Sequence, residues 1–367
     1  MRRSFTLLAV AACGIVPRVL LLRLPGLGRD EAAYLYWSHD PEFAYSPLLQ
    51  VALWFADALP GAAAWTLRLP ALVGGVAALV LARRLAGSAR QPAVVALFLS
   101  PWWVFSSSMV HPDALLLPAL LALCLARRRG HAFGVAVAAS LAAWAKPSGL
   151  LAIPVALVFL ADPRLGGPWR RLNAALLALS AASVVAPILR PEIFSSLREF
   201  ASADPTVAWQ WRWGIGLLAL VLLTGPHMLA AAVGNAWRAR GLQLEALLPT
   251  VFAAAFAFAA LFWGQFKITW FLPAIVLWTL LPTTGRARAR RRPLLAASSA
   301  ALSLLLALAF ARPDWTQRAE AAFPALAASY AAQAGGRERE VSSTSNWSQR
   351  CREYDSLESF VGQLRTA

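Results

Sequence analysis

The chain has 367 residues, of which 59% are apolar and 14% are charged, and its mean hydropathy is +0.57. Soluble domains carry about a quarter charged residues, so this composition excludes an ordinary water-soluble protein. The formal charge is +16, but the arginines gather in short clusters between apolar runs. That pattern is typical of the cytoplasmic loops of a membrane protein, and we therefore expect no nucleic-acid partner.

The apolar residues recur in runs of about 13–23 residues, and a helix of roughly 20 residues crosses a hydrocarbon core. We therefore predict an all-α polytopic membrane protein with about eleven transmembrane helices. The expected spans are 5–24, 64–82, 92–109, 114–126, 131–145, 148–162, 173–189, 213–235, 246–263, 270–284 and 294–311.

The orientation follows from the charges. If Arg2 and Arg3 lie inside, alternation of the spans places every later basic cluster inside too: Arg83-Arg84, Arg127 to Arg129, Arg170-Arg171, Arg238 with Arg240, and 286–292. Most acids then fall outside. This agrees with the positive-inside rule and predicts a membrane protein with its N-terminus in the cytoplasm and its C-terminus outside.

The long outer segment 25–63 contains two amphipathic stretches, 29–38 and 47–58, which we expect to form short helices at the membrane interface, with Pro47 in a first turn. Beyond Arg312 the composition becomes polar. We therefore divide the chain into a transmembrane domain, 1–311, and a short extracytoplasmic C-terminal tail, 312–367.

Two groups of acids lie on the outer face. Asp30 and Glu31 begin the first interfacial stretch, where acids also complement a helix dipole without any further role. Asp113 follows His111 and Pro112 at the start of the fourth span. There it can cap the helix, carry chemistry, or do both.

The two lysines are a compositional signal. Lys146 and Lys267 are the only lysines among 34 basic residues, and both fall at outer helix ends, away from the cytoplasmic clusters. A lysine ammonium suits a phosphate oxygen, although lysines also snorkel to the interface. Lys267 opens a segment that continues through Trp270 to Pro273. Arg18, within the first span, and Arg212 are weaker candidates.

These motifs together resemble the GT-C class of membrane glycosyltransferases, especially bacterial relatives of protein O-mannosyltransferases and of the lipid A aminoarabinose transferase. The resemblance covers about residues 1–285 and rests on Asp30-Glu31 after the first span, Asp113, Lys146, and the stretch from Lys267 to Pro273. The chain has Tyr45-Ser46-Pro47 where the family often has His-Pro-Pro. The family's large outer C-terminal domain is missing or reduced to the tail.

The resemblance implies an inverting transfer of a hexosyl or pentosyl group from a polyprenyl-phosphate sugar to an extracytoplasmic hydroxyl. The acceptor would be lipid A, another glycan or a protein. Asp30 would be the general base, Glu31 and Asp113 would orient the acceptor or support the base, and Lys146 and Lys267 would hold the donor phosphate. Further contacts are Tyr34, His111, Arg212 and Trp270. The metal remains open, with Asp30 and Asp113 as the acids that would bind a divalent ion.

Two other classes of protein remain as alternatives. A transporter or lipid flippase usually places ionisable residues near the bilayer midplane, whereas the acids here lie almost entirely outside the spans. A non-catalytic scaffold of the cell envelope conflicts with no feature of the sequence. The clustering of charged candidates at one interface favours the enzyme.

Overall fold

The computed structural model describes residues 2–23, 46–59, 64–86, 91–162, 170–189, 244–263 and 268–280. It also describes shorter pieces at 31, 34–35, 38, 165, 218, 220–224, 228–229, 232–233, 236, 299–305 and 308. Within these ranges the chain is helical, with turns and no strand. The predicted tail 312–367 and most of the predicted spans 213–235 and 294–311 lie outside the described residues.

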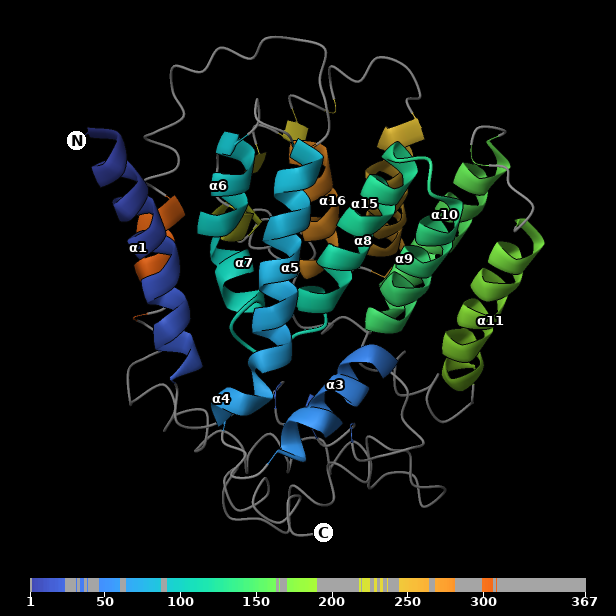
Figure 1. The fold of residues 1–367 in the computed structure, drawn as a ribbon, viewed down its shortest axis with the longest axis horizontal. Helices are drawn as coiled ribbons and strands as arrows, with labels where there is room; N and C mark the ends of the chain where they lie inside the picture. Colours follow the sequence, from blue (N-terminus) through green and yellow to red (C-terminus); the bar gives the residue numbers. More distant parts are fainter. Residues whose placement is uncertain are drawn as a thin grey trace.

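Figure 1 shows the helices coloured in chain order from the N-terminus to the C-terminus. They are α1 (Arg2–Leu22), α3 (Pro47–Asp57), α4 (Ala64–Leu67), α5 (Leu69–Ala86), α6 (Gln91–Leu99), α7 (Pro101–Ser106), α8 (Asp113–Arg128), α9 (Ala132–Ala145), the 3₁₀ helix η2 (Pro147–Leu151), α10 (Ala152–Ala161), α11 (Arg170–Ile188), α15 (Leu244–Trp263) and α16 (Ile268–Leu280).

The predicted span 92–109 is wrong as a single helix, because the chain breaks into α6 and α7 at Ser100. Ser100 is extended, with φ −64° and ψ 127°, and Pro101 follows it. A residue before proline is pushed out of the helical region, and proline has no N–H with which to continue the hydrogen-bond ladder. The same chemistry at Pro147 makes the predicted span 148–162 begin as η2 before α10.

One helical segment in the described part of the chain, Trp65–Ala86, is long and apolar enough to cross a membrane by length and composition. Six shorter apolar helical stretches accompany it: Ala11–Leu22, Ala132–Ala145, Pro147–Ala161, Arg171–Pro187, Ala246–Phe258 and Phe271–Leu280. The total of eleven spans is not confirmed and stays a prediction.

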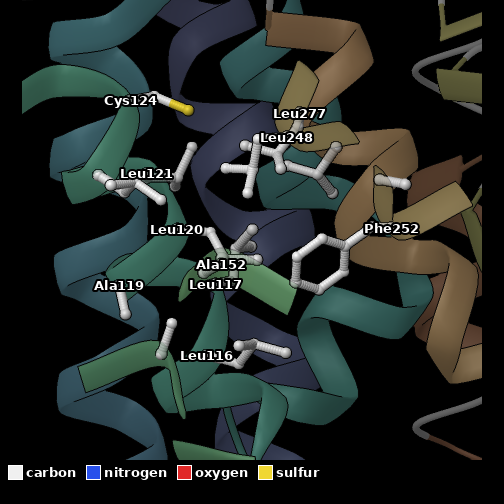
Figure 2. Close-up of a cluster of buried hydrophobic side chains, with 14 of the residues drawn as sticks. Leu116, Leu117, Ala119, Leu120, Leu121, Cys124, Ala152, Leu248, Phe252 and Leu277 are labelled. Carbon is white, nitrogen blue, oxygen red and sulfur yellow. The ribbon is translucent and has the colours of Figure 1, made fainter. Parts of the chain in front are cut away.

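The core is centred on α8, which packs between α5 and α9. Figure 2 shows its apolar side chains meeting side chains from the α10, α15 and α16 regions: Leu116, Leu117, Leu120, Leu121, Ala152, Leu248, Phe252 and Leu277. Gly74 and Gly75 let α5 approach closely, because a Cβ at either position would overlap Ala114 or Ser107. Because these two glycines have no side chains, the start of α8 packs directly against α5.

Large apolar side chains also cover the outside of the bundle. Val73, Val76 and Val80 are exposed along one face of α5, and Leu172 and Leu179 are exposed on α11. A water-soluble protein rarely exposes such continuous apolar faces, whereas helices in lipid do. The exposed faces therefore agree with the membrane location that the composition predicts.

Helix α3 lies across the lower ends of α5 and α9 in Figure 1. It occupies the predicted interfacial stretch 47–58, and Pro47 is in its first turn as predicted. Leu49 and Leu53 are buried beneath it, while Trp54 and Phe55 are exposed. This division is the one expected of a helix that lies along a membrane interface.

Candidate functional site

Asp113 is the first residue of α8 and is completely buried. Pro112 occupies the cap position, and the helix start has no side-chain capping hydrogen bond. Instead, the Asp113 carboxylate reaches across to α9, where Oδ1 accepts a hydrogen bond of 2.8 Å from Lys146 Nζ. The simple capping interpretation of Asp113 is therefore not what the structure contains.

Lys146 lies between α9 and η2, in extended conformation and followed by Pro147. It is 6% exposed, so its ammonium is buried against Asp113 and does not snorkel to the surface. The residue before it is also tied down, because Ser46 Oγ donates a 2.5 Å hydrogen bond to the Ala145 carbonyl oxygen. Three separate helices, α3, α8 and α9, thus fix this lysine.

The third member of the cluster is His111, which is partly exposed. Its Nδ1 accepts a hydrogen bond of 3.2 Å from the Asp113 backbone N–H and lies 3.4 Å from Asp113 Oδ2. In the described part of the chain, Oδ2 is buried without a hydrogen-bond partner. One oxygen of Asp113 therefore neutralises Lys146, and the other remains an acceptor inside the protein.

Glu31 is held from two sides and is 3% exposed. Arg68 grips it in a bidentate ion pair, with Nε 2.9 Å from Oε1 and Nη2 2.7 Å from Oε2. The Val110 backbone N–H donates a further 2.8 Å hydrogen bond to Oε1. Because Val110 immediately precedes His111, Glu31 fixes the backbone that leads into the Asp113 cluster.

Arg68 was not predicted from the sequence, although it is completely buried and completes this arrangement. Its Nη1 donates to the carbonyl oxygens of Leu21 and Leu22, at 3.2 Å and 3.4 Å. The last turn of α1 is thereby joined to Glu31. A signal was present: Arg68 is an arginine at the outer end of a predicted span, on the side that the positive-inside rule disfavours.

The structure describes three of the remaining candidates and leaves three others outside the described residues. Tyr34 is half-buried and lies three residues beyond Glu31. Arg18 is buried in α1, where its Nε donates to Ser107 Oγ at 3.0 Å and its guanidinium stacks on Phe98. Trp270 lies in the first turn of α16, and only its backbone is described. Three candidates lie outside the described residues: Asp30, Arg212 and Lys267.

The described residues contain no group of three or more His, Cys, Asp or Glu side chains that could hold a metal ion. Asp30, the other acid proposed for a metal, lies outside them. Within the described part, Asp113 Oδ2 is an oxygen ligand that a hard divalent cation could accept. His111 Nδ1, at 3.4 Å from it, receives the Asp113 N–H and is already engaged.

No protein-family model and no curated protein matches the sequence. Two solved structures are similar to the chain, both of ArnT from Cupriavidus metallidurans. The structure in the apo state shares 17% identity over 96% of this chain and 69% of that chain, with a TM-score of 0.49. The structure bound to undecaprenyl phosphate shares 17% identity over 98% of this chain and 71% of that chain, with a TM-score of 0.48.

The likeness is too distant to assign an activity. Any assignment of function rests on the residues of the site.

Proposed function

We propose that the chain is an integral-membrane glycosyltransferase. It moves a sugar from a polyprenyl-phosphate donor to a hydroxyl group on the extracytoplasmic side of a bacterial inner membrane. The acceptor is lipid A, another envelope glycan or a protein hydroxyl. The observation that carries the proposal is the buried Asp113–Lys146 pair, which has an unpaired carboxylate oxygen beside His111 at one end of the helix bundle.

The pair is chemically suited to a donor with an anionic leaving group. Burying a carboxylate and an ammonium together is no better for stability than packing apolar side chains, so a buried pair is weak evidence of a purely structural role. Enclosed pairs of charged side chains are instead common where a protein handles charged intermediates. The location at helix ends, and not at mid-bundle, supports an enzyme over a transporter.

In the proposed reaction the acceptor oxygen attacks the anomeric carbon while the bond from that carbon to the phosphate oxygen breaks. The hydroxyl proton passes to the Asp30 carboxylate, and the polyprenyl phosphate leaves with the electron pair. Attack from the face opposite the phosphate inverts the anomeric centre. A positioned carboxylate base and a cation at the leaving group are the two contributions this displacement needs.

We assign Lys146 and Lys267 to the donor phosphate. A lysine ammonium has three N–H donors and can contact two oxygen acceptors at once, so Lys146 can bridge Asp113 and a phosphate oxygen. The Asp113 oxygen without a partner is available to accept a hydrogen bond from a substrate hydroxyl. Glu31, whose two oxygens are engaged by Arg68 and Val110, supports the position of the neighbouring base and has little capacity left for substrate.

The test is the substitution Asp30→Asn. Removal of a positioned general base lowers the rate by about 10²–10⁴-fold. Asparagine matches aspartate in size and in capping preference, so stability should hardly change. The assay is sugar transfer from labelled polyprenyl-phosphate donors to envelope acceptors, with mass spectrometry of glycolipids and glycoproteins from a deletion strain identifying the natural pair. A stable Asp30→Asn protein with full activity would remove Asp30 from catalysis.

A further inference from the structure

Helix α7 has only six residues and interrupts what the sequence predicts to be one continuous span. The chain turns after Ser106 and reaches Asp113 within seven residues. Interrupted helices at membrane depth are tolerated where the freed backbone is buried in protein or lines a polar space. They recur at the substrate sites of membrane transporters. The interruption therefore directs attention to the side chains that α7 carries.

The segment from Trp102 to Asp113, which includes most of α7 and the first residue of α8, contains several buried polar atoms without a hydrogen-bond partner. Ten buried side-chain nitrogen or oxygen atoms in the described residues have no hydrogen-bond partner, and five of them belong to residues 102–113. They are Trp102 Nε1, Trp103 Nε1, Ser106 Oγ, Ser108 Oγ and Asp113 Oδ2. Buried indole N–H and hydroxyl groups ordinarily find a partner, so a cluster of exceptions calls for a ligand or water.

The first three of these groups share one face of α7. At about 100° per residue, Ser106 projects between Trp102 and Trp103. The opposite face is occupied by Val104 and Phe105, which pack toward Leu21 of α1. Trp102 and Trp103 belong instead to the main core beside α8. The unpaired groups of α7 thus point into the bundle, on the side of the helix that begins with Asp113.

We propose that this face of α7, with Ser108 and Asp113, binds the sugar ring of the lipid-linked donor; the inference rests on the proposed function. Sugar hydroxyls both donate and accept hydrogen bonds. They can accept from the indole N–H groups and donate to Asp113 Oδ2. The oxygens of a fully ionised phosphate only accept hydrogen bonds, so they cannot donate to Asp113 Oδ2 as a sugar hydroxyl can. The chemistry of the set therefore favours the sugar over the phosphate, which is left to the lysines.

All five atoms are enclosed in the ligand-free chain. Entry of a sugar therefore requires α7 and the turn after it to separate from α8, and we expect binding to be accompanied by this movement. Ser106 and Ser108 need only rotate their hydroxyls to reach a new partner.

The experiment compares binding of bare undecaprenyl phosphate with binding of undecaprenyl phosphate that carries mannose or aminoarabinose, to the full chain in nanodiscs. Ser106→Ala and Trp102→Phe should each lose about 3- to 10-fold in affinity for the sugar-bearing lipid, the usual effect of one hydrogen bond. Their affinity for the bare lipid should not change. Ser140→Ala is the matched control, because Ser140 is also buried with an unpaired hydroxyl but lies on α9.

Three results would overturn the proposal. In the first, the α7 variants bind both lipids as the Ser140→Ala protein does, although wild type binds bare lipid and transfers sugar; α7 then has only a packing role and the enzyme assignment stands. In the second, the variants lose affinity for both lipids equally, which makes α7 a phosphate contact. In the third, wild-type protein binds no polyprenyl phosphate, and the proposed function fails together with the inference.

Discussion

Asp113 and Lys146 neutralise each other inside the protein although 33 positions separate them in the sequence. Each was picked out separately, the acid from its place before a span and the lysine from its rarity, and the structure joins them. Their proximity changes the expected behaviour of variants. Removing one partner of a buried pair leaves the other as an uncompensated buried charge, at a cost of about 3–5 kcal/mol.

We therefore expect Lys146→Ala to lose both donor affinity and stability. The double variant Lys146→Ala with Asp113→Asn removes both charges and should recover most of the stability without recovering donor binding. Thermal unfolding in detergent measures the first effect, and binding of undecaprenyl phosphate measures the second. Lys146→Arg should restore binding only in part, since the planar guanidinium places its charge differently.

Recovery of donor binding together with stability in the double variant would contradict the role of Lys146 at the phosphate. The lysine would then serve only to neutralise Asp113. A suitable control is Arg84→Ala. Arg84 lies in the last turn of α5 and is not a residue of the candidate site, so this substitution should leave thermal stability and donor binding unchanged.

Glu31, Asp113 and Lys146 were singled out from residue identity and order, and their role in a functional site stays a prediction. The sequence could not indicate which side chains pair with one another. Glu31 was placed among the catalytic acids, whereas its carboxylate is engaged by Arg68 and by the Val110 N–H. These partners come from segments 37 and 79 positions away. Such contacts depend on how helices pack, and helical periodicity alone does not contain that information.

At the scale of elements, the limits of the helices follow from local chemistry and could largely be predicted. Apolar runs between arginine clusters mark α5, α8 and α9 to within a few residues. The break between α6 and α7 was missed because the apolar run continues through it. Proline at 101 was the available signal, and it acts through the extended conformation that it imposes on Ser100.

The connection from α9 to α10 shows how one element positions the site. η2 folds back on α9 directly after Lys146, and the Gly149 N–H donates a 2.7 Å hydrogen bond to the Lys146 carbonyl oxygen. A Cβ at Gly149 would overlap the Ala142 carbonyl of α9. The absence of a side chain here is what allows this close return of the chain.

We expect Gly149→Ala to push η2 away from α9 and to cost about 1–3 kcal/mol, as overpacking usually does. The displacement should move Lys146, so donor binding should fall as well. Gly130→Ala is the control: Gly130 has φ +68° and open space around its Cα. That substitution should cost about 1–2 kcal/mol through backbone strain alone and leave donor binding intact. Equal effects of the two substitutions on binding would contradict a specific role of η2.

At the scale of the whole molecule, the candidate site and the basic clusters lie at opposite ends of the same helices. α8 begins at Asp113 and ends with Arg127 and Arg128, and α9 runs back from Ala132 to Lys146. At 1.5 Å per residue, the 16 residues of α8 separate its two ends by about 24 Å. At the basic end, Arg127 pairs with Asp162 at 2.5 Å, and Arg128 donates to the Leu85 carbonyl oxygen.

Because the candidate site and the arginine clusters lie at opposite helix ends, the orientation of the chain in the membrane can be predicted and tested. Arginine clusters remain on the cytoplasmic side of bacterial membranes, so the Asp113–Lys146 end should be extracytoplasmic. Reporter fusions after Arg129, Arg171 and Arg292 should score cytoplasmic. Fusions near Ser46, Glu199 and Ala367 should score external. Each pair of neighbouring fusions checks the parity of the spans between them, including those outside the described residues.

The fusion at Ala367 is decisive for the number of spans. An external score requires an odd number of crossings from a cytoplasmic N-terminus, in agreement with eleven, whereas a cytoplasmic score would make that number wrong. The fusions near Ser46 and after Arg129 are decisive for the site. If the first were cytoplasmic and the second external, the Asp113–Lys146 pair would face the cytoplasm, where no extracytoplasmic acceptor could reach it, and the proposed reaction would have to be abandoned.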